Sequence, residues 1–452
     1  MTRPRVLLDG YNLALAKGTG IATYTRNLSR RLGAMGHGVD VLYGLRGPTG
    51  ARGGLLAEVD FFSETFRRGG TNQMLRRLMT SWRGERAFEV PMDGRVIAKG
   101  QADRMPHYDR ILNDPEVFPF SRWHHRWYRR FLEVGYERPA DLAHWTAPIP
   151  MRLKGKPNLY TIHDLVPLRL PHAVGGNHRQ FHAIVSDIAR KADHIVTVSE
   201  ASKRDIVDLL KVPEDRVTNT YQGVDLPADL LARSEDEVAA EVSDLFGLEP
   251  RGYFLYFGAI EPKKNVGRLI EAYLGSRVAA PLVVAGALAW RDASDLRLLD
   301  PAGINETEML LRLRRGGAEV PKTFDPTLTR FTRSSVMRIE YLPFRLLVSL
   351  IRSARAVVFP SIYEGFGLPI LEAMMLGTPV ITSTEGAVPE VAGDAARLVD
   401  PYDVLAIRAA IRDLDADAGL REHLAAAGRV QAARFSNEAY DARLAALYAR
   451  WT

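Results

Sequence analysis

Short apolar runs alternate with helix-like segments in two successive series, and this alternation restricts the fold more than any other feature of the sequence. Such runs suit strands that are buried on both faces of a parallel sheet. Their alternation with helical patterns is typical of βαβ units. We therefore expect an α/β protein with two parallel sheets, whose strands cover residues 6–9, 39–43, 159–162 and 194–198 in the first series and 253–257, 282–285, 338–341, 356–359 and 380–382 in the second.

A charged segment with two prolines, residues 225–252, separates the two series. The 452 residues exceed what one hydrophobic core usually holds, and they suit two domains of about 200 residues each. We predict a Rossmann-like domain over 1–227 and a second over 228–436. A last helix, 437–452, carries Leu444, Leu447 and Tyr448 on one face, and it can cross back to the first domain. Residues 46–140 and 291–337 receive no assignment.

The composition excludes several classes of protein. The chain has no cysteine, which rules out a disulfide framework, a thiolate metal site and a cysteine nucleophile. The N-terminus lacks the apolar core of a signal peptide. The longest nearly apolar run, 279–290, is shorter than the roughly 20 residues of a membrane span. We expect a cytoplasmic protein, and a peripheral position at the inner face of the membrane stays open.

Positive charge is concentrated in the first half of the chain. Residues 1–225 carry 34 Lys and Arg against 24 Asp and Glu. A basic surface of this kind attracts an anionic lipid surface, a diphosphate or a nucleic acid. A merely solvated, arginine-rich surface explains the same numbers equally well, so the charge alone does not select a partner.

Residues 357–381 form the most informative motif of the chain. Their pattern is strand, glycine-containing turn, helix and second strand. Gly365 and Gly367 allow backbone N–H groups to approach a ligand closely. Pro369 suits the first turn of the helix, and Gly377 suits its end. Because the N-terminus of a helix attracts anions, this turn predicts an anion-binding site.

Two carboxylates flank the same turn. Glu364 precedes the glycines, and Glu372 lies one turn into the helix, away from its apolar stripe. A carboxylate accepts two hydroxyl hydrogen bonds at once, which suits the diols of a sugar or a ribose. We expect these acids to bind hydroxyl groups, while backbone amides and cations bind phosphate. The alternative is a pair of solvated glutamates beside an ordinary turn.

Glu364 and Glu372, with seven residues between them, resemble the double-glutamate motif of the retaining GT-B glycosyltransferases of family four. The resemblance implies two Rossmann-like domains that face each other across a cleft. It also implies that Glu364 contacts the donor sugar and Glu372 the nucleotide ribose. The resemblance further implies that backbone amides between the two glutamates contact the donor. We assign this contact to Gly365, Phe366, Gly367 and Leu368.

Lys263 and Lys264 stand in a second strand–turn–helix segment, just before a helix that Asn265 is placed to cap. Two ammonium groups there can neutralise a diphosphate and stabilise a leaving nucleotide without a metal ion. The segment resembles the Glu-Pro-Arg-Lys motif of the same family. Lys263 stands where arginine is more common, and Ala259 stands where some members have a further basic residue.

Two sites in the first half complete the resemblance. Gly18, Thr19 and Gly20 precede a helical pattern, and they lack the GxGxxG spacing of dinucleotide enzymes. They are similar to the family's glycine loop, which meets the pyrophosphate and the acceptor. His163 and Asp164 end a strand, where open α/β sheets bind ligands. The family has a histidine in this setting near the donor sugar, so we predict His163, Lys264 and Glu364 as catalytic residues.

No metal site is predicted. Asp415 and Asp417 have the spacing of a metal-binding pair, but they lie in a charged helical stretch that no strand enters, as expected for a solvated face. His124 and His125 stand among aromatic residues without a carboxylate at ligand spacing. We expect no cofactor besides the nucleotide sugar, which is a substrate.

The resemblance implies transfer of a hexose, with retained configuration, to a saccharide or a polyprenyl-diphosphate-linked saccharide in surface polysaccharide synthesis. The sequence looks similar to bacterial mannosyltransferases, so GDP-mannose is the first choice of donor. UDP-hexoses stay open, with contacts to the base expected near residues 341–344. Two other classes are considered: a non-catalytic protein that binds sugar nucleotides, and nucleic-acid binding through the basic, tryptophan-containing residues 76–131. We expect no nucleic-acid partner.

Overall fold

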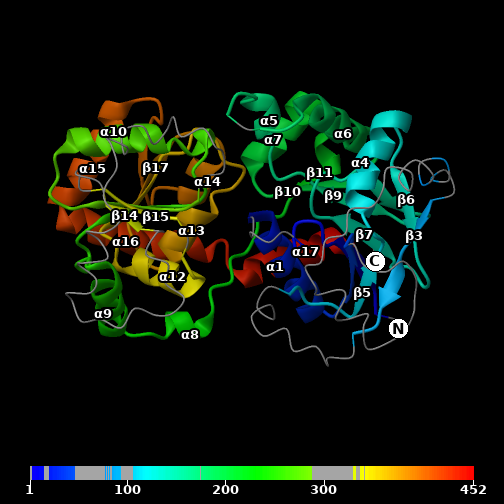
Figure 1. Ribbon diagram of the computed structural model, residues 1–452, viewed down its shortest axis with the longest axis horizontal. Helices are drawn as coiled ribbons and strands as arrows, with labels where there is room; N and C mark the ends of the chain where they lie inside the picture. The colour runs from blue at the N-terminus through cyan, green and yellow to red at the C-terminus, as the bar shows by residue number, and fades with distance from the viewer. Residues whose placement is uncertain are drawn as a thin grey trace. The chain divides into compact units, whose positions relative to one another are not determined.

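The computed structural model describes residues 3–14, 20–45, 77, 79, 81, 84–92, 105–173, 175–287, 329–331, 336–340 and 342–451. The chain forms two compact units, each of which is described by itself (Figure 1). Unit 1 comprises Met1–Leu165, Asn177–Gly223 and Asn437–Thr452, and unit 2 comprises Val166–Gly176 and Val224–Ser436.

Unit 1 is built on an eight-stranded sheet of order β11-β10-β9-β7-β1-β2-β5-β4. All neighbours are parallel except β4, which pairs antiparallel with β5 at one edge. The strands are β1 (Arg5–Asp9), β2 (Gly38–Tyr43), β4 (Phe88–Val90), β5 (Arg110–Asn113), β7 (Leu142–Trp145), β9 (Asn158–Thr161), β10 (His194–Thr197) and β11 (Val217–Asn219).

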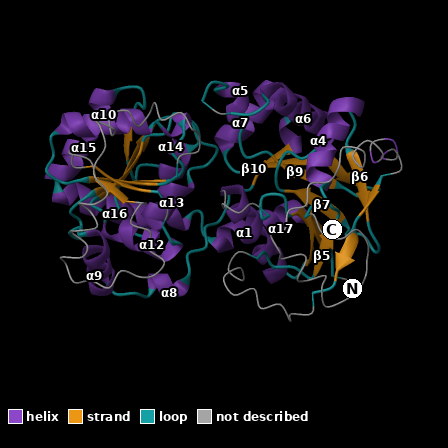
Figure 2. Ribbon diagram, viewed as in Figure 1, coloured by secondary structure: helices purple, strands orange, loops and turns teal. Residues whose placement is uncertain are grey.

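A smaller parallel sheet of order β3-β6-β8 belongs to the same unit. Its strands are β3 (Glu85–Arg86), β6 (Leu132–Gly135) and β8 (Met151–Leu153). The described helices of unit 1 cover both sides of the large sheet (Figure 2). They are α1 (Gly20–Ala34), α4 (Val117–Tyr128), α6 (His178–Lys191), α7 (Glu200–Leu210), the short η3 (Glu214–Arg216) and α17 (Asn437–Tyr448).

The C-terminal helix α17 packs in unit 1, although the preceding residues belong to unit 2. Its Leu444, Leu447 and Tyr448 are buried, together with Tyr440. The Tyr448 hydroxyl hydrogen-bonds Nδ1 of the buried His144 on β7. These apolar and polar contacts anchor the end of the chain beside the central strands of unit 1.

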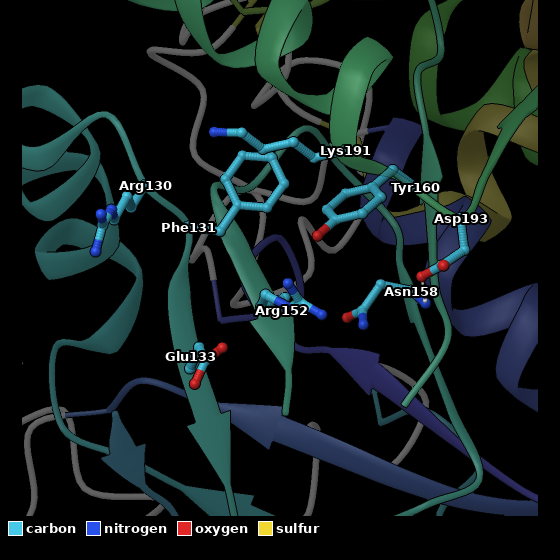
Figure 3. Close-up of a pocket in the computed structure, with 8 residues that line it drawn as sticks. All are labelled: Arg130, Phe131, Glu133, Arg152, Asn158, Tyr160, Lys191 and Asp193. Carbon is cyan, nitrogen blue, oxygen red and sulfur yellow. Dashed lines mark hydrogen bonds between the residues drawn. The ribbon is translucent and has the colours of Figure 1, made fainter. Parts of the chain in front are cut away.

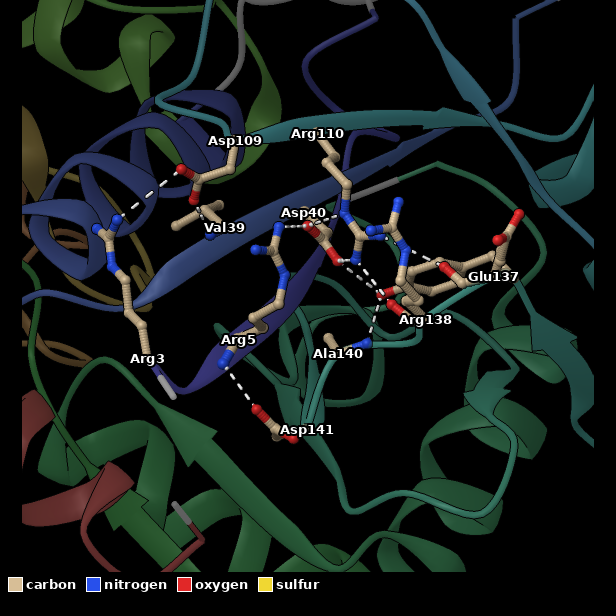
Figure 4. A network of polar contacts seen from close by, with 11 residues as sticks. Arg3, Arg5, Val39, Asp40, Asp109, Arg110, Glu137, Arg138, Ala140 and Asp141 are labelled. Atoms are coloured by element: carbon tan, nitrogen blue, oxygen red, sulfur yellow. Dashed lines mark hydrogen bonds and ion pairs between the residues drawn. The ribbon is translucent and has the colours of Figure 1, made fainter. Parts of the chain in front are cut away.

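A polar network holds the amino ends of β1, β2 and β5 together (Figure 4). Asp40, which is fully buried on β2, accepts hydrogen bonds from Arg5 and Arg110 on the neighbouring strands. The Tyr136 hydroxyl also donates to Asp40, over 3.0 Å, and accepts a hydrogen bond from the Ala140 amide. A buried carboxylate is tolerated when it is paired and hydrogen-bonded in this way.

Unit 2 is built on a seven-stranded sheet of order β14-β15-β13-β12-β16-β17-β18, in which only β14 is antiparallel to its neighbour. The strands are β12 (Phe254–Phe257), β13 (Leu282–Ala285), β14 (Thr329–Phe331), β15 (Val336–Ile339), β16 (Ala356–Phe359), β17 (Val380–Ser383) and β18 (Arg397–Val399).

The helices described in unit 2 lie on both sides of its sheet (Figure 2). They are α5 (Val166–Arg169), α8 (Ala228–Leu231), α9 (Glu235–Phe246), η4 (Pro262–Lys264), α10 (Val266–Ser276), α12 (Phe344–Ser353), α13 (Leu368–Met375), α14 (Val388–Ala392), α15 (Val404–Ala416) and α16 (Ala418–Ala433). Ser234 begins α9 with a complete capping box, and Gly247 ends it in the left-handed conformation.

The structure has the predicted α/β class and contains each expected strand, with shifted bounds and several further strands. The strand expected at 338–341 is β15, which begins at Val336 and ends at Ile339. Leu142–Trp145, which the sequence did not single out, forms the central strand β7 between β1 and β9. Part of the unassigned stretch 46–140 also folds, since it supplies β3 to β6 and α4. Within the described part of the chain, no helix has the length and apolarity needed to cross a membrane.

Candidate functional site

The strand order of unit 2 reverses between β12 and β16. From β12 the chain continues to β13 and β15 on one side, and from β16 it continues to β17 and β18 on the other. At such a point the loops that leave the two strands diverge, and open α/β sheets bind ligands at the carboxyl ends there. The two loops at this point are residues 258–265 and 360–367, which carry the lysine and glutamate motifs.

Backbone and amide hydrogen bonds join these two loops. The Ile362 amide donates to the carbonyl of Lys263 over 2.8 Å. Nδ2 of Asn265 donates to the carbonyls of Pro360 and Pro401, at 3.0 and 2.6 Å. The prediction that the Asn265 side chain caps the next helix is wrong. Asn265 precedes α10 in the left-handed conformation, with φ 62°, and its amide binds the neighbouring loops instead.

Lys264 and Glu364 meet at the centre of the site. Nζ of Lys264 lies 2.6 Å from Oε1 of Glu364, and the side chains are only 13% and 8% exposed. The same ammonium lies 4.9 Å from the centroid of the Phe359 ring at the end of β16. Lys263 makes a longer ion pair, 3.6 Å, with Glu261 of its own loop. The structure therefore places both predicted lysines and Glu364 at the switch point.

Opposing effects act on the Glu364 carboxyl group. Burial raises its pKa, but the ammonium groups of Lys264 and Lys263 outweigh this effect and hold the pKa below the usual 4.5. Glu364 is therefore ionised at neutral pH. A ligand that contacts it meets a charged acceptor whose partner is a cation from the other loop.

Glu372 has a different environment on the second turn of α13. Its carboxylate is half-buried, and within the described residues no hydrogen bond or ion pair of its side chain is found. Burial alone raises the pKa of Glu372 to about 7. An acceptor that is partly removed from water without a partner is costly, and hydroxyl donors from a ligand would reduce this cost.

The turn between the two glutamates can contact a ligand through its backbone groups. Gly367 has φ 108°, a conformation that favours glycine, and it begins α13. The Phe366 ring is buried edge-to-face against Phe435, with centroids 5.6 Å apart. Phe366 can therefore contact a ligand through its backbone only. Gly365 is buried and Leu368 is half-buried.

Close contact between two loops requires glycine at position 286, after β13. A Cβ atom there would lie 1.8 Å from the carbonyl oxygen of Gly258, the first residue after β12. Gly258 itself has φ 132° and donates its amide to Ala285 over 2.9 Å. This contact fixes the start of the lysine-bearing loop.

Unit 1 has an equivalent switch point between β1 and β7. Asp9 ends β1 and is fully buried. One oxygen, Oδ2, accepts the amide and the hydroxyl hydrogen of Thr146, which follows β7. The other oxygen, Oδ1, is buried without a hydrogen-bond partner among the described atoms. Burial raises the pKa of Asp9 to about 6, against the effect of the Thr146 hydrogen bonds.

His163 joins this arrangement from the end of β9. Its Nε2 lies 2.9 Å from the carbonyl oxygen of Thr146. Because a carbonyl only accepts, Nε2 carries the proton. The ring also packs edge-to-face on Tyr24, with centroids 4.8 Å apart. Burial lowers the pKa of His163, so its other nitrogen, Nδ1, is a neutral acceptor at physiological pH.

Several predicted residues lie outside the described part of the chain. They are Gly18 and Thr19 of the glycine loop and Tyr341 of the segment expected to contact the base. Gly20 is described and exposed at the start of α1. Phe344, the last residue of the base segment, begins α12 and is exposed.

No role was predicted for Asp9 from the sequence. Its signal was available, because a carboxylate directly after a fully apolar run must lie at the end of a buried strand. The carboxylate that pairs with His125 was also missed. Nε2 of His125 lies 2.6 Å from Asp187 on α6, 62 residues away in sequence.

The two aspartates with metal-ligand spacing have separate roles. Asp415 forms an ion pair with Arg355. Asp417 caps α16 by accepting the Leu420 amide over 2.9 Å. Within the described residues, no group of three or more acidic or histidine side chains could hold a metal ion.

Two family models match this chain. Residues 18–227 match the model described as glycosyltransferase family 4, and residues 245–431 match the model described as glycosyl transferases group 1. Together the two glycosyltransferase models cover most of the chain, and the family 4 model covers most of its first half. The two matched segments correspond to most of unit 1 and most of unit 2, and the second contains the whole Lys264–Glu364 site.

Similar curated proteins are bacterial mannosyltransferases. The chain is 36% identical over 249 residues to O-antigen chain mannosyltransferase B of Escherichia coli, an alignment that covers 54% of this chain and 57% of that protein. It spans 44% of the length of the E. coli serotype-specific mannosyltransferases. It is 28% identical to the MMP alpha-(1->4)-mannosyltransferase of Mycolicibacterium hassiacum over 95% of this chain and 94% of that one.

Solved structures confirm the GT-B fold of this chain. Sucrose-phosphate synthase from Thermosynechococcus elongatus aligns over 99% of both chains with a TM-score of 0.63 at 17% sequence identity. At this identity the likeness concerns the fold alone, and the chemistry must be argued from the residues of the two switch points.

Proposed function

We propose that this glycosyltransferase moves a hexosyl group from a nucleotide diphosphate sugar to a saccharide or polyprenyl-diphosphate-linked saccharide acceptor in cell-surface polysaccharide synthesis. Mannose from GDP-mannose is the first choice. The proposal is carried by one observation: the Lys264–Glu364 ion pair joins the two loops at the switch point of unit 2. The similarity to bacterial mannosyltransferases supports the choice of sugar.

In this proposal unit 2 binds the donor. Glu364 accepts hydroxyl hydrogens of the sugar, and the half-buried Glu372 accepts those of the ribose. The diphosphate is neutralised by Lys263 and Lys264 and by the amides of residues 365–368. When the donor binds, Lys264 contacts the diphosphate and Glu364 contacts the sugar hydroxyls. Each charged side chain then keeps an opposite charge or a hydrogen-bond donor close to it.

The transfer itself needs no metal ion in this proposal. The bond between the anomeric carbon and the diphosphate oxygen breaks, and the electron pair leaves with the diphosphate. The acceptor hydroxyl attacks the same face and gives its proton to the departing oxygen, so the configuration is retained without a protein nucleophile. Lys263 and Lys264 stabilise the negative charge that develops on the leaving group.

Unit 1 provides the acceptor side of the proposal. His163 holds a fixed tautomer through the carbonyl of Thr146, and its Nδ1 can accept a hydrogen bond from a sugar hydroxyl. We assign it this contact and not the role of a general base. The glycine loop of Gly18, Thr19 and Gly20 is proposed to meet the diphosphate and the acceptor.

The most direct test is a panel of sugar nucleotides incubated with the purified chain, with released GDP or UDP as the readout. Release from GDP-mannose above the other donors supports the proposal. A preference for a UDP-hexose would replace the donor but keep the reaction. No release with any donor, despite binding, would support the alternative of a non-catalytic sugar-nucleotide-binding protein.

Two variants connect the activity to the site. Glu364→Ala and Lys264→Ala are each expected to abolish transfer in chains that keep the native circular dichroism spectrum. The matched control is Glu249→Ala, an exposed glutamate that precedes β12. Wild-type turnover in either site variant would refute the assignment.

A further inference from the structure

Helix α4 exposes three aromatic side chains in unit 1. Trp123 is 49% exposed, Trp127 64% and Tyr128 47%. Trp123 and Trp127 are four residues apart, so they lie on one side of the helix. Single exposed apolar residues are ordinary, but adjacent large aromatic side chains on one helix mark an interaction surface.

The opposite side of α4 is fixed to the body of unit 1. Val117, Phe120, His124 and His125 are buried. His125 is hydrogen-bonded to Asp187 on α6, and His124 to the carbonyl of Arg130 over 3.1 Å. The helix is therefore held by its buried face, and the exposed position of the tryptophans is set by packing.

The exposed side of α4 is cationic as well as aromatic. Residues 117–130 contain Arg122, Arg126, Arg129 and Arg130 and no acidic residue. Arg126, Arg129 and Arg130 are exposed. An indole ring beside guanidinium groups combines an apolar body with positive charge, which complements a surface that is apolar below and anionic above.

A pocket of about 220 Å³ begins where α4 ends (Figure 3). Three exposed cations line it, namely Arg130, Arg152 and Lys191. In Figure 3 the rings of Phe131 and Tyr160 lie between Lys191 on one side and Arg152 on the other. Lys191 also links the pocket to α4, because Nζ donates to the carbonyl of Arg129 over 3.1 Å.

The carboxylates of this pocket already have partners. Asp193 accepts the Asn158 amide over 2.7 Å, and Glu133 lies 3.7 Å from Nζ of Lys154. Lys191 is also paired with Asp187, which does not line the pocket, at 3.6 Å. The three cations still outnumber the two carboxylates that line it. This excess of positive charge suits a phosphate group.

We propose that α4 and this pocket form a docking surface for a membrane that contains anionic phospholipid. Trp123, Trp127 and Tyr128 enter the interfacial layer, where tryptophan and tyrosine are preferred. The arginines contact the anionic surface, and the pocket holds one phosphate headgroup between Arg130, Arg152 and Lys191. The surface belongs to unit 1 and is separate from the donor site in unit 2.

A membrane fits these observations better than a single-stranded nucleic acid. Proteins that bind single strands need a groove that follows the backbone, with rings on which successive bases stack. Here the tryptophans stand on the outer face of a helix, and the pocket accommodates one small group. RNA binding is therefore an outcome of the test and not part of the proposal.

The test uses the full chain and sedimentation with vesicles. We expect binding to vesicles that contain phosphatidylglycerol, weak binding to phosphatidylcholine alone, and loss of binding at high salt. A blue shift of tryptophan fluorescence should accompany binding. Equal binding to both vesicles, no binding to either, or tighter binding to single-stranded RNA than to anionic vesicles would overturn the proposal.

Two variants separate the aromatic and cationic parts. Trp123→Ala with Trp127→Ala should weaken vesicle binding at least roughly tenfold, because two indoles no longer leave water. Arg130→Gln, Arg152→Gln and Lys191→Gln together should weaken it on the order of 100-fold, since each cation near the surface contributes about 1 kcal/mol. Inorganic phosphate should not release the wild-type chain from vesicles, and such release would point to a free-phosphate pocket instead.

Matched controls lie in unit 2. Leu405→Ala with Val430→Ala removes two exposed apolar side chains, and Arg251→Gln with Arg277→Gln removes two exposed cations. Both should bind vesicles as the wild type does. All four variants should release nucleotide from a soluble donor at the wild-type rate, which shows that they are folded. A loss of vesicle binding in the controls equal to that in the α4 and pocket variants would contradict the proposal.

Discussion

Unit 1 and unit 2 place polar groups at the same position of similar parallel sheets, but the groups are of different kinds. In unit 2 a lysine and a glutamate from two loops form an ion pair, and the half-buried Glu372 has no side-chain partner among the residues that the structure describes. In unit 1 a buried aspartate accepts hydrogen bonds from Thr146, whose carbonyl in turn accepts a hydrogen bond from His163. The fold therefore provides the position, while the residues at the strand ends decide whether the site offers an ion pair between two loops or a fixed hydrogen-bond network around one buried acid.

The largest effect is expected when the ion pair of unit 2 is broken from one side. Lys264→Met removes the hydrogen-bonded cation of the buried Glu364 and leaves Lys263 as the remaining cation, so the free energy of unfolding should fall by about 3 kcal/mol. Lys264→Met with Glu364→Gln should recover most of this stability but no transfer activity. Chemical denaturation and nucleotide release measure the two quantities. Equal stability of the single and double variants would show that the pair is not a coupled buried unit.

The buried acid of unit 1, Asp9, should make the folded chain more stable at low pH than at high pH. The pKa of Asp9 in the folded chain, about 6, lies above its ordinary value of 3.8. A raised pKa contributes stability below the unfolded value, and this stability is lost as the pH rises through the folded value. Asp9→Asn should therefore remove about 3 kcal/mol of pH-dependent stability between pH 4 and pH 7.

Glu364 should make stability depend on pH in the opposite direction, because its pKa is lowered below 4.5. Its contribution to stability is present at neutral pH and is lost as the pH falls through the lowered value. Glu364→Gln should flatten the acid side of the stability profile, whereas Asp9→Asn flattens the range up to pH 6. If the two variants changed the same pH range, the comparison between the units would fail.

Glu372 is expected to have an intermediate effect on binding. Glu372→Gln removes the negative charge and replaces one of the two acceptor oxygens with an NH2 donor, so the Kd of the nucleotide should rise roughly tenfold. The same change should stabilise the free chain at pH 8, because an unpartnered carboxylate with a pKa of about 7 is no longer charged there. Calorimetry and thermal unfolding test the two parts. A tighter nucleotide complex in the variant would contradict the assigned role.

The smallest effect is expected at His163. His163→Asn can keep a donor toward the carbonyl of Thr146 but loses the Nδ1 acceptor, so kcat/KM should fall by roughly threefold. His172→Asn, an exposed histidine that precedes α6, is the control. A loss as large as that of Lys264→Ala would mean that His163 takes part in the chemical step.

Much of the fold could be predicted because its signals are local. Apolar runs such as 254–257 and 356–359 are buried throughout, as expected for central parallel strands. β7 was missed because Leu142–Trp145 contains a histidine and a tryptophan in a four-residue run. Its buried His144 is satisfied by Tyr448, 304 residues away in sequence, and no local pattern could indicate that partner.

The candidate site also combines features that could be predicted from the sequence with features that could not. Turn residues and helix starts around Gly367 followed from sequence, because glycine and proline act on the backbone beside them. The side chain of Asn265 did not, since its acceptors, Pro360 and Pro401, belong to other loops. The pairing of His125 with Asp187 was hidden for the same reason.

The sequence by itself determined the strand–turn–helix units and the kinds of side chain on their turns, because hydrophobic periodicity and turn chemistry act over a few residues. Only the tertiary structure decided that Lys264 and Glu364, 100 residues apart, share one hydrogen bond. It also decided that α17 returns to unit 1. The physical reason is that strand order and core packing depend on the burial of the whole chain, and this order makes β12 and β16 neighbours.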